Sequence, residues 1–268
     1  MPAQQQALTV VRYNMFTLFK KIRGNNTILK MFRVVVKEQA FSFDTKLLID
    51  TILDILSDKF KTLPTDYFIT GPYPDEGWKT KNGFLKAVER KQFKNICHLI
   101  LSTGLYSFSF ENWLLNDAKP KDRDYQAIEF SINEKICDPE KMEDIYRELA
   151  IVFKANYAII FQLPTNYMPS TESKIKGGFF NYSVAKNPKE NIWRQYIDKV
   201  DKALIKDIYP INFINDSVLN SDSFQRSIVS KNIGKLDRSG NGLYKWILSR
   251  EEIVMAKEKL ADTNLLPK

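Results

Sequence analysis

Apolar residues recur along the chain with two different periods, and the period separates predicted strands from predicted helices. Residues 106–110 alternate aromatic side chains with serine, the period-two pattern of a half-buried strand, and residues 127–132 repeat such an alternation. We expect these two segments to pair as an antiparallel hairpin with a long connection. The β-branched run 31–36 and the apolar run 158–163 are suited to strands.

Helical periodicity follows several residues that can cap a helix. Asp138 precedes Pro139, and this pair indicates a helix start because aspartate can cap the first turn and proline fits its first position. Ser249 and Glu252 have the spacing of a capping box, which predicts the start of the last helix. Further helices are predicted after Asp44, over 84–102 and over 191–206.

Glycine and proline mark the predicted turns and loops. Residues 71–78 contain two of each, a composition that excludes regular structure there. Residues 239–242, with the sequence Ser-Gly-Asn-Gly, lie between two apolar runs and predict a C-terminal hairpin. Residues 164–188 are rich in serine, asparagine, glycine and lysine, so we expect an extended loop or an internal boundary.

The order of these elements predicts an α+β fold with a mixed, largely antiparallel sheet covered by helices. Residues 127–163 form a strand-helix-strand unit, and its crossover should be right-handed if its strands are parallel neighbours. The predicted organisation is an N-terminal α+β region over 1–163 with a basic first segment, the boundary at 164–188, and a C-terminal helix-hairpin-helix region over 189–268. We expect the last region to pack on the same body.

The formal net charge of +8 is concentrated at the start of the chain. Residues 1–37 contain seven lysines and arginines and no acid, whereas the remainder is nearly balanced. Much of this segment has an apolar stripe at helical spacing, which favours a first helix, or a hairpin strand turning at 24–26, packed on the core. The alternative is that its basic side chains bind nucleic acid, an anionic membrane surface or an acidic partner. These side chains are Arg12, Lys20, Lys21 and Arg23.

Motifs for metal, phosphate or nucleophilic chemistry are absent from the sequence. The single histidine, His98, lies in the apolar run 96–101, where a buried structural imidazole is the favoured interpretation. One histidine excludes a two-histidine zinc site, and Cys97 beside His98 on a helix would point in a different direction. The glycine-rich phosphate-binding patterns do not occur. We therefore predict a non-enzyme with no catalytic or metal site and no cofactor.

Paired carboxylates are the enzymatic alternative, in the form of a carboxylate-dependent hydrolase. The acids that would line its cleft are Asp122, Asp124 and Glu129, or Glu111 with Asp117. Acidic residues in loops are usually solvated, so this hypothesis requires a concave acidic pocket in the structure.

Aromatic and basic residues in the predicted loops indicate a binding surface. Tyr73 and Trp78 lie in the proline-rich loop, and other aromatic residues follow a pair of lysines in 164–188. Aromatic side chains and arginine are typical of binding hot spots, although each ring would equally well fold back on the sheet. The remaining candidate contacts for a protein partner are Lys119, Lys121, Arg123, Lys174, Lys176, Phe179, Phe180 and Tyr182.

Three segments of the C-terminal third resemble the tail of bacterial immunity proteins that accompany polymorphic toxins and type VI secretion effectors. They are Asp207-Ile208-Tyr209-Pro210-Ile211-Asn212, Ile233-Gly234-Lys235-Leu236, and Gly242-Leu243-Tyr244-Lys245-Trp246 leading into Ser249-Arg250-Glu251-Glu252. The resemblance covers about residues 204–266. It implies a cytosolic non-enzyme that neutralises its toxin by tight binding. Contacts in such pairs vary, so the resemblance transfers no site residues.

The cysteine content and the hydropathy of the chain indicate the cellular compartment. The two cysteines, Cys97 and Cys137, form neither a disulfide framework nor a zinc cluster, which favours a reducing environment. The longest apolar runs, such as 157–163, are far shorter than the roughly 20 residues that span a bilayer. We expect a cytoplasmic protein with a protein partner, and nucleic acid is the less favoured partner.

Overall fold

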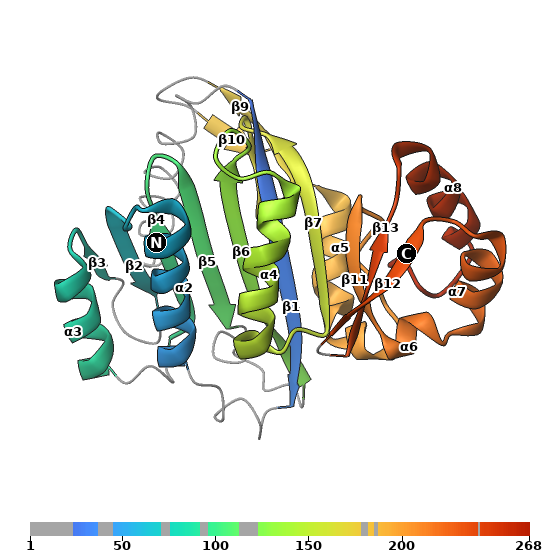
Figure 1. The fold of residues 1–268 in the computed structure, drawn as a ribbon, viewed down its shortest axis with the longest axis horizontal. Coiled ribbons are helices and arrows are strands. Elements are labelled where there is room, and N and C mark those ends of the chain that lie inside the picture. The colour runs from blue at the N-terminus through green and yellow to red at the C-terminus, as the bar shows by residue number, and fades with distance from the viewer. Residues whose placement is uncertain are drawn as a thin grey trace.

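The computed structural model describes residues 24–36, 45–70, 76–91, 96–112, 123–177, 182–184, 187–240 and 242–268. Among these, ten strands form one sheet in which all neighbouring strands are antiparallel. In spatial order they are β12 (Lys235–Gly240), β13 (Leu243–Ile247), β11 (Ile211–Asn215), β7 (Tyr157–Pro164), β1 (Asn25–Val36), β6 (Arg123–Asn133), β5 (Tyr106–Asn112), β4 (His98–Ser102), β2 (Asp66–Thr70) and β3 (Glu76–Trp78). The predicted α+β fold with a largely antiparallel sheet is confirmed (Figure 1).

The long strand β1 is the centre of the sheet. It pairs with β6 on one side and with β7 on the other, so β6 and β7 run parallel to each other without being neighbours. The helix α4 (Pro139–Phe153) connects them, and the predicted strand-helix-strand unit therefore crosses over β1. β5 and β6 form the expected antiparallel pair, with Phe108 opposite Phe130.

One face of the sheet, here called the first face, is covered by α2 (Thr45–Phe60), α3 (Lys81–Lys91) and α4 (Figure 1). Alternate strand residues such as Leu29, Leu99 and Phe108 are fully buried there among apolar side chains. In α4 the Asp138 carboxylate accepts a hydrogen bond from the Lys141 backbone N–H at 2.9 Å, as the predicted cap requires. The first face is thus a continuous apolar core.

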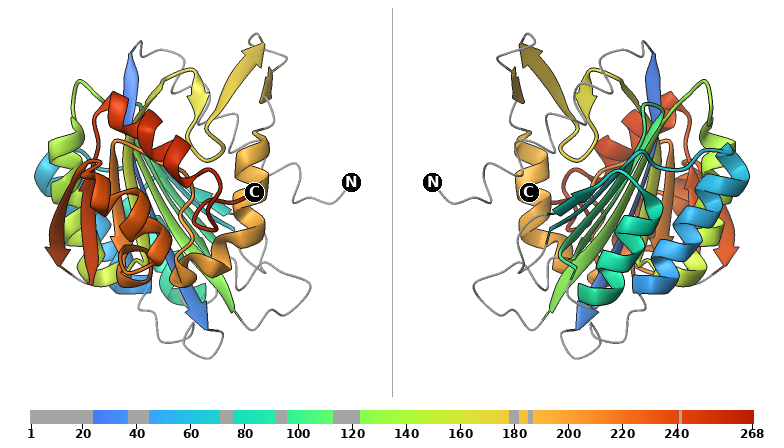
Figure 2. Two further views of the ribbon diagram at one scale, coloured as in Figure 1. Left: turned by 90° about the vertical axis from the view of Figure 1, so that its right-hand side faces the viewer. Right: turned by 90° about the vertical axis from the view of Figure 1, so that its left-hand side faces the viewer.

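The opposite, second face carries α5 (Pro188–Tyr196) and the 3-10 helix η4 (Ile197–Lys202), on the other side of the sheet from α2, α3 and α4 (Figure 2). Its apolar cluster includes Trp193 and Trp246, and the Trp246 indole donates to the Ile233 carbonyl at 2.9 Å. The Ser249 and Glu252 capping box is present at the start of α8. The other short helices near this cluster are α6 (Asp216–Leu219), α7 (Asp222–Ser227), η5 (Val229–Lys231) and α8 (Arg250–Leu260).

Several local predictions are wrong. Residues 84–102 do not form one helix, since α3 ends at Lys91 and His98–Ser102 is strand β4, held between β2 and β5. Residues 76–78 form β3 rather than an irregular loop, because they pair with β2. The predicted turn position at 24–26 belongs largely to β1, which begins at Asn25. In each case pairing with another strand overrides the local pattern.

Residues 164–188 contain a small three-stranded sheet of β8 (Tyr167–Met168), β9 (Ser173–Gly177) and β10 (Tyr182–Val184). The C-terminal strands β11, β13 and β12 extend the main sheet from β7, with Ile211 opposite Ile160. Among the helices of the described residues, none combines the length and the apolar character needed to cross a membrane.

Candidate functional site

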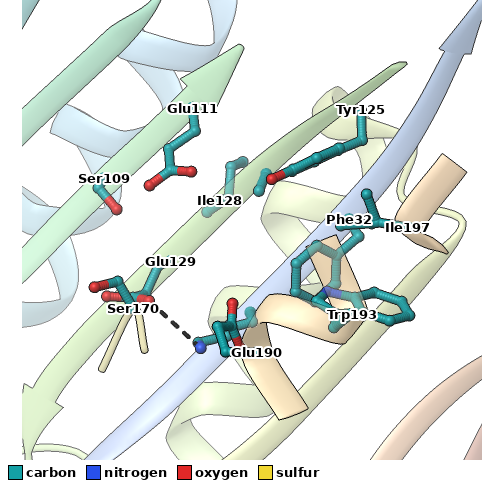
Figure 3. A pocket seen from close by; sticks show the side chains of 12 residues that line it. Phe32, Ser109, Glu111, Tyr125, Ile128, Glu129, Ser170, Glu190, Trp193 and Ile197 are labelled. Atoms are coloured by element: carbon teal, nitrogen blue, oxygen red, sulfur yellow. Dashed lines mark ion pairs between the residues drawn. The ribbon is translucent and has the colours of Figure 1, made fainter. Parts of the chain in front are cut away.

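A pocket opens on the second face of the sheet, where α5 approaches β1, β5 and β6 (Figure 3). Its cavity volume is about 30 Å³, room for about two water molecules. One part of the wall is aromatic and apolar and consists mainly of Phe32, Tyr125, Trp193 and Ile197. The polar lining consists of Lys30, Ser109, Glu111, Glu129, Ser170 and Glu190.

Strand alternation explains why these polar side chains share one face. Lys30 lies opposite Glu129 in the β1 and β6 pair, and Glu129 lies opposite Ser109 in the β6 and β5 pair. Because side chains of directly paired residues point to the same side of a sheet, these three form a row across the strands. Glu111 is two residues beyond Ser109 and therefore faces the same way. Figure 3 shows Glu111, Glu129 and Glu190 arranged around one space.

Behind the pocket, one carboxylate binds two buried lysines. Glu172 accepts a hydrogen bond from Lys30 at 3.1 Å and also contacts Lys206, and both lysine side chains are only 4% exposed. Lys206 lies 2.7 Å from Glu190, and Lys30 lies 3.7 Å from Glu129. The Tyr209 hydroxyl is 2.9 Å and 3.1 Å from the two Glu172 oxygens. We call Lys30, Glu129, Glu172, Glu190, Lys206 and Tyr209 the charge network.

The backbone at Glu172 is in the left-handed region, with φ of 52°. A non-glycine residue in this region is strained by about 1–3 kcal/mol. Glu172 lies in the turn between β8 and β9, and the turn is held by Asn187, which donates to the Thr171 carbonyl at 3.0 Å. The contacts of Glu172 with the two lysines and Tyr209 therefore offset a strained backbone.

The charge network shifts the pKa values of its carboxyl groups in opposite directions. Burial would raise the pKa of Glu172, but Lys30 and Lys206 outweigh this effect and lower it to about 2. Burial raises the pKa of Glu129 to about 7, and Lys30 only partly opposes the shift while Glu111 adds to it. Glu172 is thus fully ionised at neutral pH, whereas Glu129 is poised between its two forms.

The pKa values of the two buried lysines are also shifted in opposite directions. Burial would lower the pKa of Lys30, but Glu172, Glu129 and Glu190 together raise it above its ordinary value. Burial and the neighbouring charge of Lys30 lower the pKa of Lys206 despite Glu172 and Glu190. With Glu111, the part of the site that the structure describes contains four glutamates and two lysines, and each lysine contacts two of the glutamates.

The described residues contain no group of three histidine, cysteine, aspartate or glutamate side chains that could hold a metal ion. Burial raises the pKa of the Cys97 thiol to about 11 and that of the Cys137 thiol to about 12, so both stay protonated at neutral pH. His98 lies in strand β4 opposite Glu111 and is half-buried. The expectation of a buried histidine within a helix is therefore wrong for its element, because strand pairing places it at the edge of the second face.

The two sets of acids proposed from the sequence are split by the structure. Glu111 and Glu129, one from each set, both line the pocket. Asp124 lies in β6, whereas Asp117 and Asp122 fall outside the described residues.

Few of the predicted partner contacts can be placed. Trp78 is half-buried in β3 and packs against Phe84, with ring centroids 6.0 Å apart. Lys174 and Lys176 are exposed on β9, while Arg123 and Tyr182 begin β6 and β10. The remaining candidates lie outside the described residues, namely Arg12, Lys20, Lys21, Arg23, Tyr73, Lys119, Lys121, Phe179 and Phe180.

Sequence reasoning did not identify Lys30, Glu172, Glu190 or Lys206. One signal was available, since Lys30 lies between the apolar residues Leu29 and Met31, directly before the predicted strand 31–36. A lysine in that position is almost never fully buried unless it is paired. The pairing with Glu172 joins residues 142 positions apart, and no local pattern reveals it.

No family model and no curated protein sequence matches the chain. Its fold is similar to that of the solved structure of the Pseudomonas aeruginosa T6SS protein PA0821, with a TM-score of 0.52 and 9% sequence identity. The likeness covers 88% of this chain and 72% of that chain. The two proteins therefore share a fold.

Proposed function

We propose that this chain is an immunity protein of a type VI secretion system, a cytoplasmic protein that neutralises a toxin by binding and occluding it. The observation that carries the proposal is the fold likeness to a protein named as a T6SS protein, which extends over 88% of the chain. The resemblance of the segment 204–266 to immunity-protein tails supports it independently of the fold comparison. Tyr209, which binds Glu172 in the charge network, belongs to one of the resembling segments.

The chemistry of the cysteines and of the second face supports binding rather than covalent catalysis. Both cysteines, which lie outside the pocket, are protonated because burial raises the pKa of each thiol. The most strongly held carboxylate, Glu172, is occupied by two lysines and a tyrosine. Buried ion pairs often add little net stability relative to apolar residues, and in some proteins they fix a unique arrangement. A pocket with a fixed charge pattern is suited to recognising a partner's surface.

The proposal is tested by co-expressing the chain with the product of the adjacent gene in a heterologous bacterium. We expect the neighbouring product alone to arrest growth and the chain to restore it. We also expect the chain and an inactivated form of that product to elute together as a stoichiometric complex in size-exclusion chromatography. Arrest that the chain does not relieve, with no complex formed, would overturn the proposal.

A second candidate function, a carboxylate-dependent hydrolase, is favoured by one observation. Glu129 has a pKa raised to about 7 and shares a pocket with Glu111, and a group with such a pKa can donate a proton at neutral pH. The test is turnover of nitrophenyl glycosides and nitrophenyl phosphate by the full chain. Activity with a pH limb near 7 that disappears in Glu129→Gln supports the hydrolase. Equal rates for the wild type and a Glu111→Gln, Glu129→Gln double variant exclude it for these substrates.

A further inference from the structure

We infer that strands β8 and β9, with the turn between them, form a hinged flap over the second face, and that Glu172 is the latch that holds it closed. The flap consists of residues 166–177, and β10 pairs with its strand β9. This inference rests on the proposed function in one respect, because it names how the partner's access to the pocket is regulated. It follows from the packing of the flap, the position of its latch and the size of the closed pocket.

The first observation is that the flap takes little part in the apolar packing of the molecule. The two apolar clusters of the sheet are built from residues up to Leu163 and from Trp193 onward, and no described residue between these two belongs to either cluster. Pro169 and Ser173 are buried in the flap. Figure 2 shows the small sheet projecting from the body above α5. Since buried apolar contacts are what resist local opening, the flap is weakly attached in this respect.

The second observation is that polar contacts from a single side chain take the place of this packing. The Glu172 carboxylate accepts hydrogen bonds from Lys30 at 3.1 Å and from the Tyr209 hydroxyl at 2.9 Å, and it also binds Lys206. All three partners belong to the body, in β1 and in the segment that precedes β11. Hydrogen bonds depend steeply on geometry, so a movement of the turn breaks all of these contacts together. Glu172 therefore acts as a latch.

The chain is fixed to the body on both sides of the small sheet, as a hinge requires. Before the flap, the Thr165 N–H donates to the Gly24 carbonyl at 3.0 Å. After β10, the Asn187 side chain caps α5 and donates to the Thr171 carbonyl at 3.0 Å. Opening releases the strained backbone at Glu172 and admits water to the two lysines, so neither is left buried without a partner. The flap can therefore open while the main sheet stays intact.

The third observation is the size of the closed pocket. Its cavity volume of about 30 Å³ admits about two water molecules but no side chain of a partner. Ser170, in the same turn as Glu172, forms part of the pocket wall (Figure 3). Movement of this turn therefore widens the pocket. A partner binds the open form, and the closed form keeps Lys30 and Lys206 out of its reach.

The test is acetylation of the full chain by N-hydroxysuccinimidyl acetate, with the rate at each lysine measured by mass spectrometry. The side chains of Lys30 and Lys206 are 4% exposed, so the reagent reaches them when the flap opens. Glu172→Gln should raise both rates by at least about tenfold, because hydrogen bonds to a charged carboxylate are lost. Tyr209→Phe should also raise them. Since Tyr209→Phe removes no charge, its effect reports the latch and not a change in lysine ionisation.

The matched control is Glu143→Gln. Glu143 has the same 15% exposure as Glu172 and pairs with Lys245 at 2.8 Å, between α4 and β13. Glu143→Gln should raise the acetylation rate of Lys245 and leave the rates of Lys30 and Lys206 unchanged. Loss of a buried carboxylate elsewhere in the fold thus does not open the flap.

Urea separates opening of the flap from unfolding of the whole chain. Local opening exposes little surface, so the wild-type rate at Lys206 should change less than about twofold up to about 1 M urea, whereas the unfolded population rises about fivefold or more. A rate that follows global unfolding, as measured by circular dichroism, would overturn the inference. Unchanged rates in Glu172→Gln would also overturn it, and Tyr209→Phe decides if Glu172→Gln does not fold.

The labelling experiment uses the chain without a partner, so its outcome is independent of the proposed function. Local opening of the flap in a chain that gives no protection from the toxin contradicts only the proposed function. Protection by a chain whose flap does not open locally contradicts only the flap.

Discussion

The two faces of the central sheet bury their residues in different ways. Met31 and Lys30 are neighbours on β1, point to opposite faces and are both almost fully buried. Met31 enters an apolar core under the helices of the first face, whereas Lys30 enters a network of charges on the second face. Burying apolar area stabilises a fold directly, while burying charges is costly unless each is paired.

This difference teaches where function is to be sought in a protein without a catalytic motif. The first face is explained by stability alone, because its core residues need only fill space. The second face retains lysines and glutamates where apolar residues would be simpler to bury. Departures from a plain apolar core are expected at functional sites, so the second face is the candidate.

The largest predicted effect is the loss of the carboxylate that the two lysines share. Glu172→Gln should lower the free energy of unfolding by about 3–5 kcal/mol at pH 7, because it leaves buried charge uncompensated. Urea denaturation followed by circular dichroism measures the change. The matched control is Glu148→Gln, whose 2.7 Å ion pair with Lys59 is exposed, and which should lose less than about 1 kcal/mol. Equal losses in the two variants would mean that the network is an ordinary surface feature.

Glu129 should have the opposite pH dependence from Glu172. Its folded pKa of about 7 lies above its ordinary value of 4.5, so the folded state binds more protons and stability falls as the pH rises from about 4.5 to beyond 7. The stabilisation that the raised pKa provides is fully present below about pH 4.5 and amounts to about 3 kcal/mol. The Glu129→Gln variant lacks this titrating carboxyl group. Its free energy of unfolding, relative to that of the wild type, should therefore increase between pH 5 and pH 9.

Glu172 supplies the contrasting behaviour within the same network. Its folded pKa of about 2 lies below the ordinary 4.5, so its stabilisation is present above about pH 4.5 and is lost as the pH falls toward 2.

On the first face, Phe108→Leu should change stability by the same amount at pH 5 and pH 9. A pH-independent effect of Glu129→Gln would show that Glu129 titrates normally.

The smallest predicted effect is the loss of stability when one tyrosine hydroxyl is removed, compared between the two faces. Tyr209→Phe removes a hydrogen bond to ionised Glu172 and should destabilise by about 1.5–3 kcal/mol. Tyr106→Phe removes a 3.3 Å bond to the neutral Thr62 carbonyl and should destabilise by about 0.5–1.5 kcal/mol. Thermal or urea unfolding of both variants gives the order, and a larger loss for Tyr106→Phe would contradict the stronger bonding on the second face.

Elements defined by local physics could be predicted from the sequence. The aromatic and serine alternation of residues 106–110, the Asp138 cap and the Ser249 capping box each act within a few residues, and all three occur in the structure. Residues 98–102 were predicted as helix because their apolar run is ambiguous between strand and helix. These residues form a strand because they pair with β2 and β5.

The candidate site was only partly predictable for a related reason. Glu111 and Glu129 could be named as candidate acids, but their common pocket depends on the register of β5 and β6. Glu172 reaches the site through a strained turn, and Lys206 lies 34 residues further along the chain. A network assembled from five separate segments has no periodic signature.

The central claim, that the pocket of the second face recognises a toxin, is tested most directly by growth protection with matched variants. Cells that express the adjacent gene product should grow when they also contain the wild-type chain or the control Glu258→Gln, which removes an exposed acid of α8. The Glu111→Gln, Glu129→Gln double variant, present at the same level and folded, should fail to protect them. Full protection by the double variant would contradict the account.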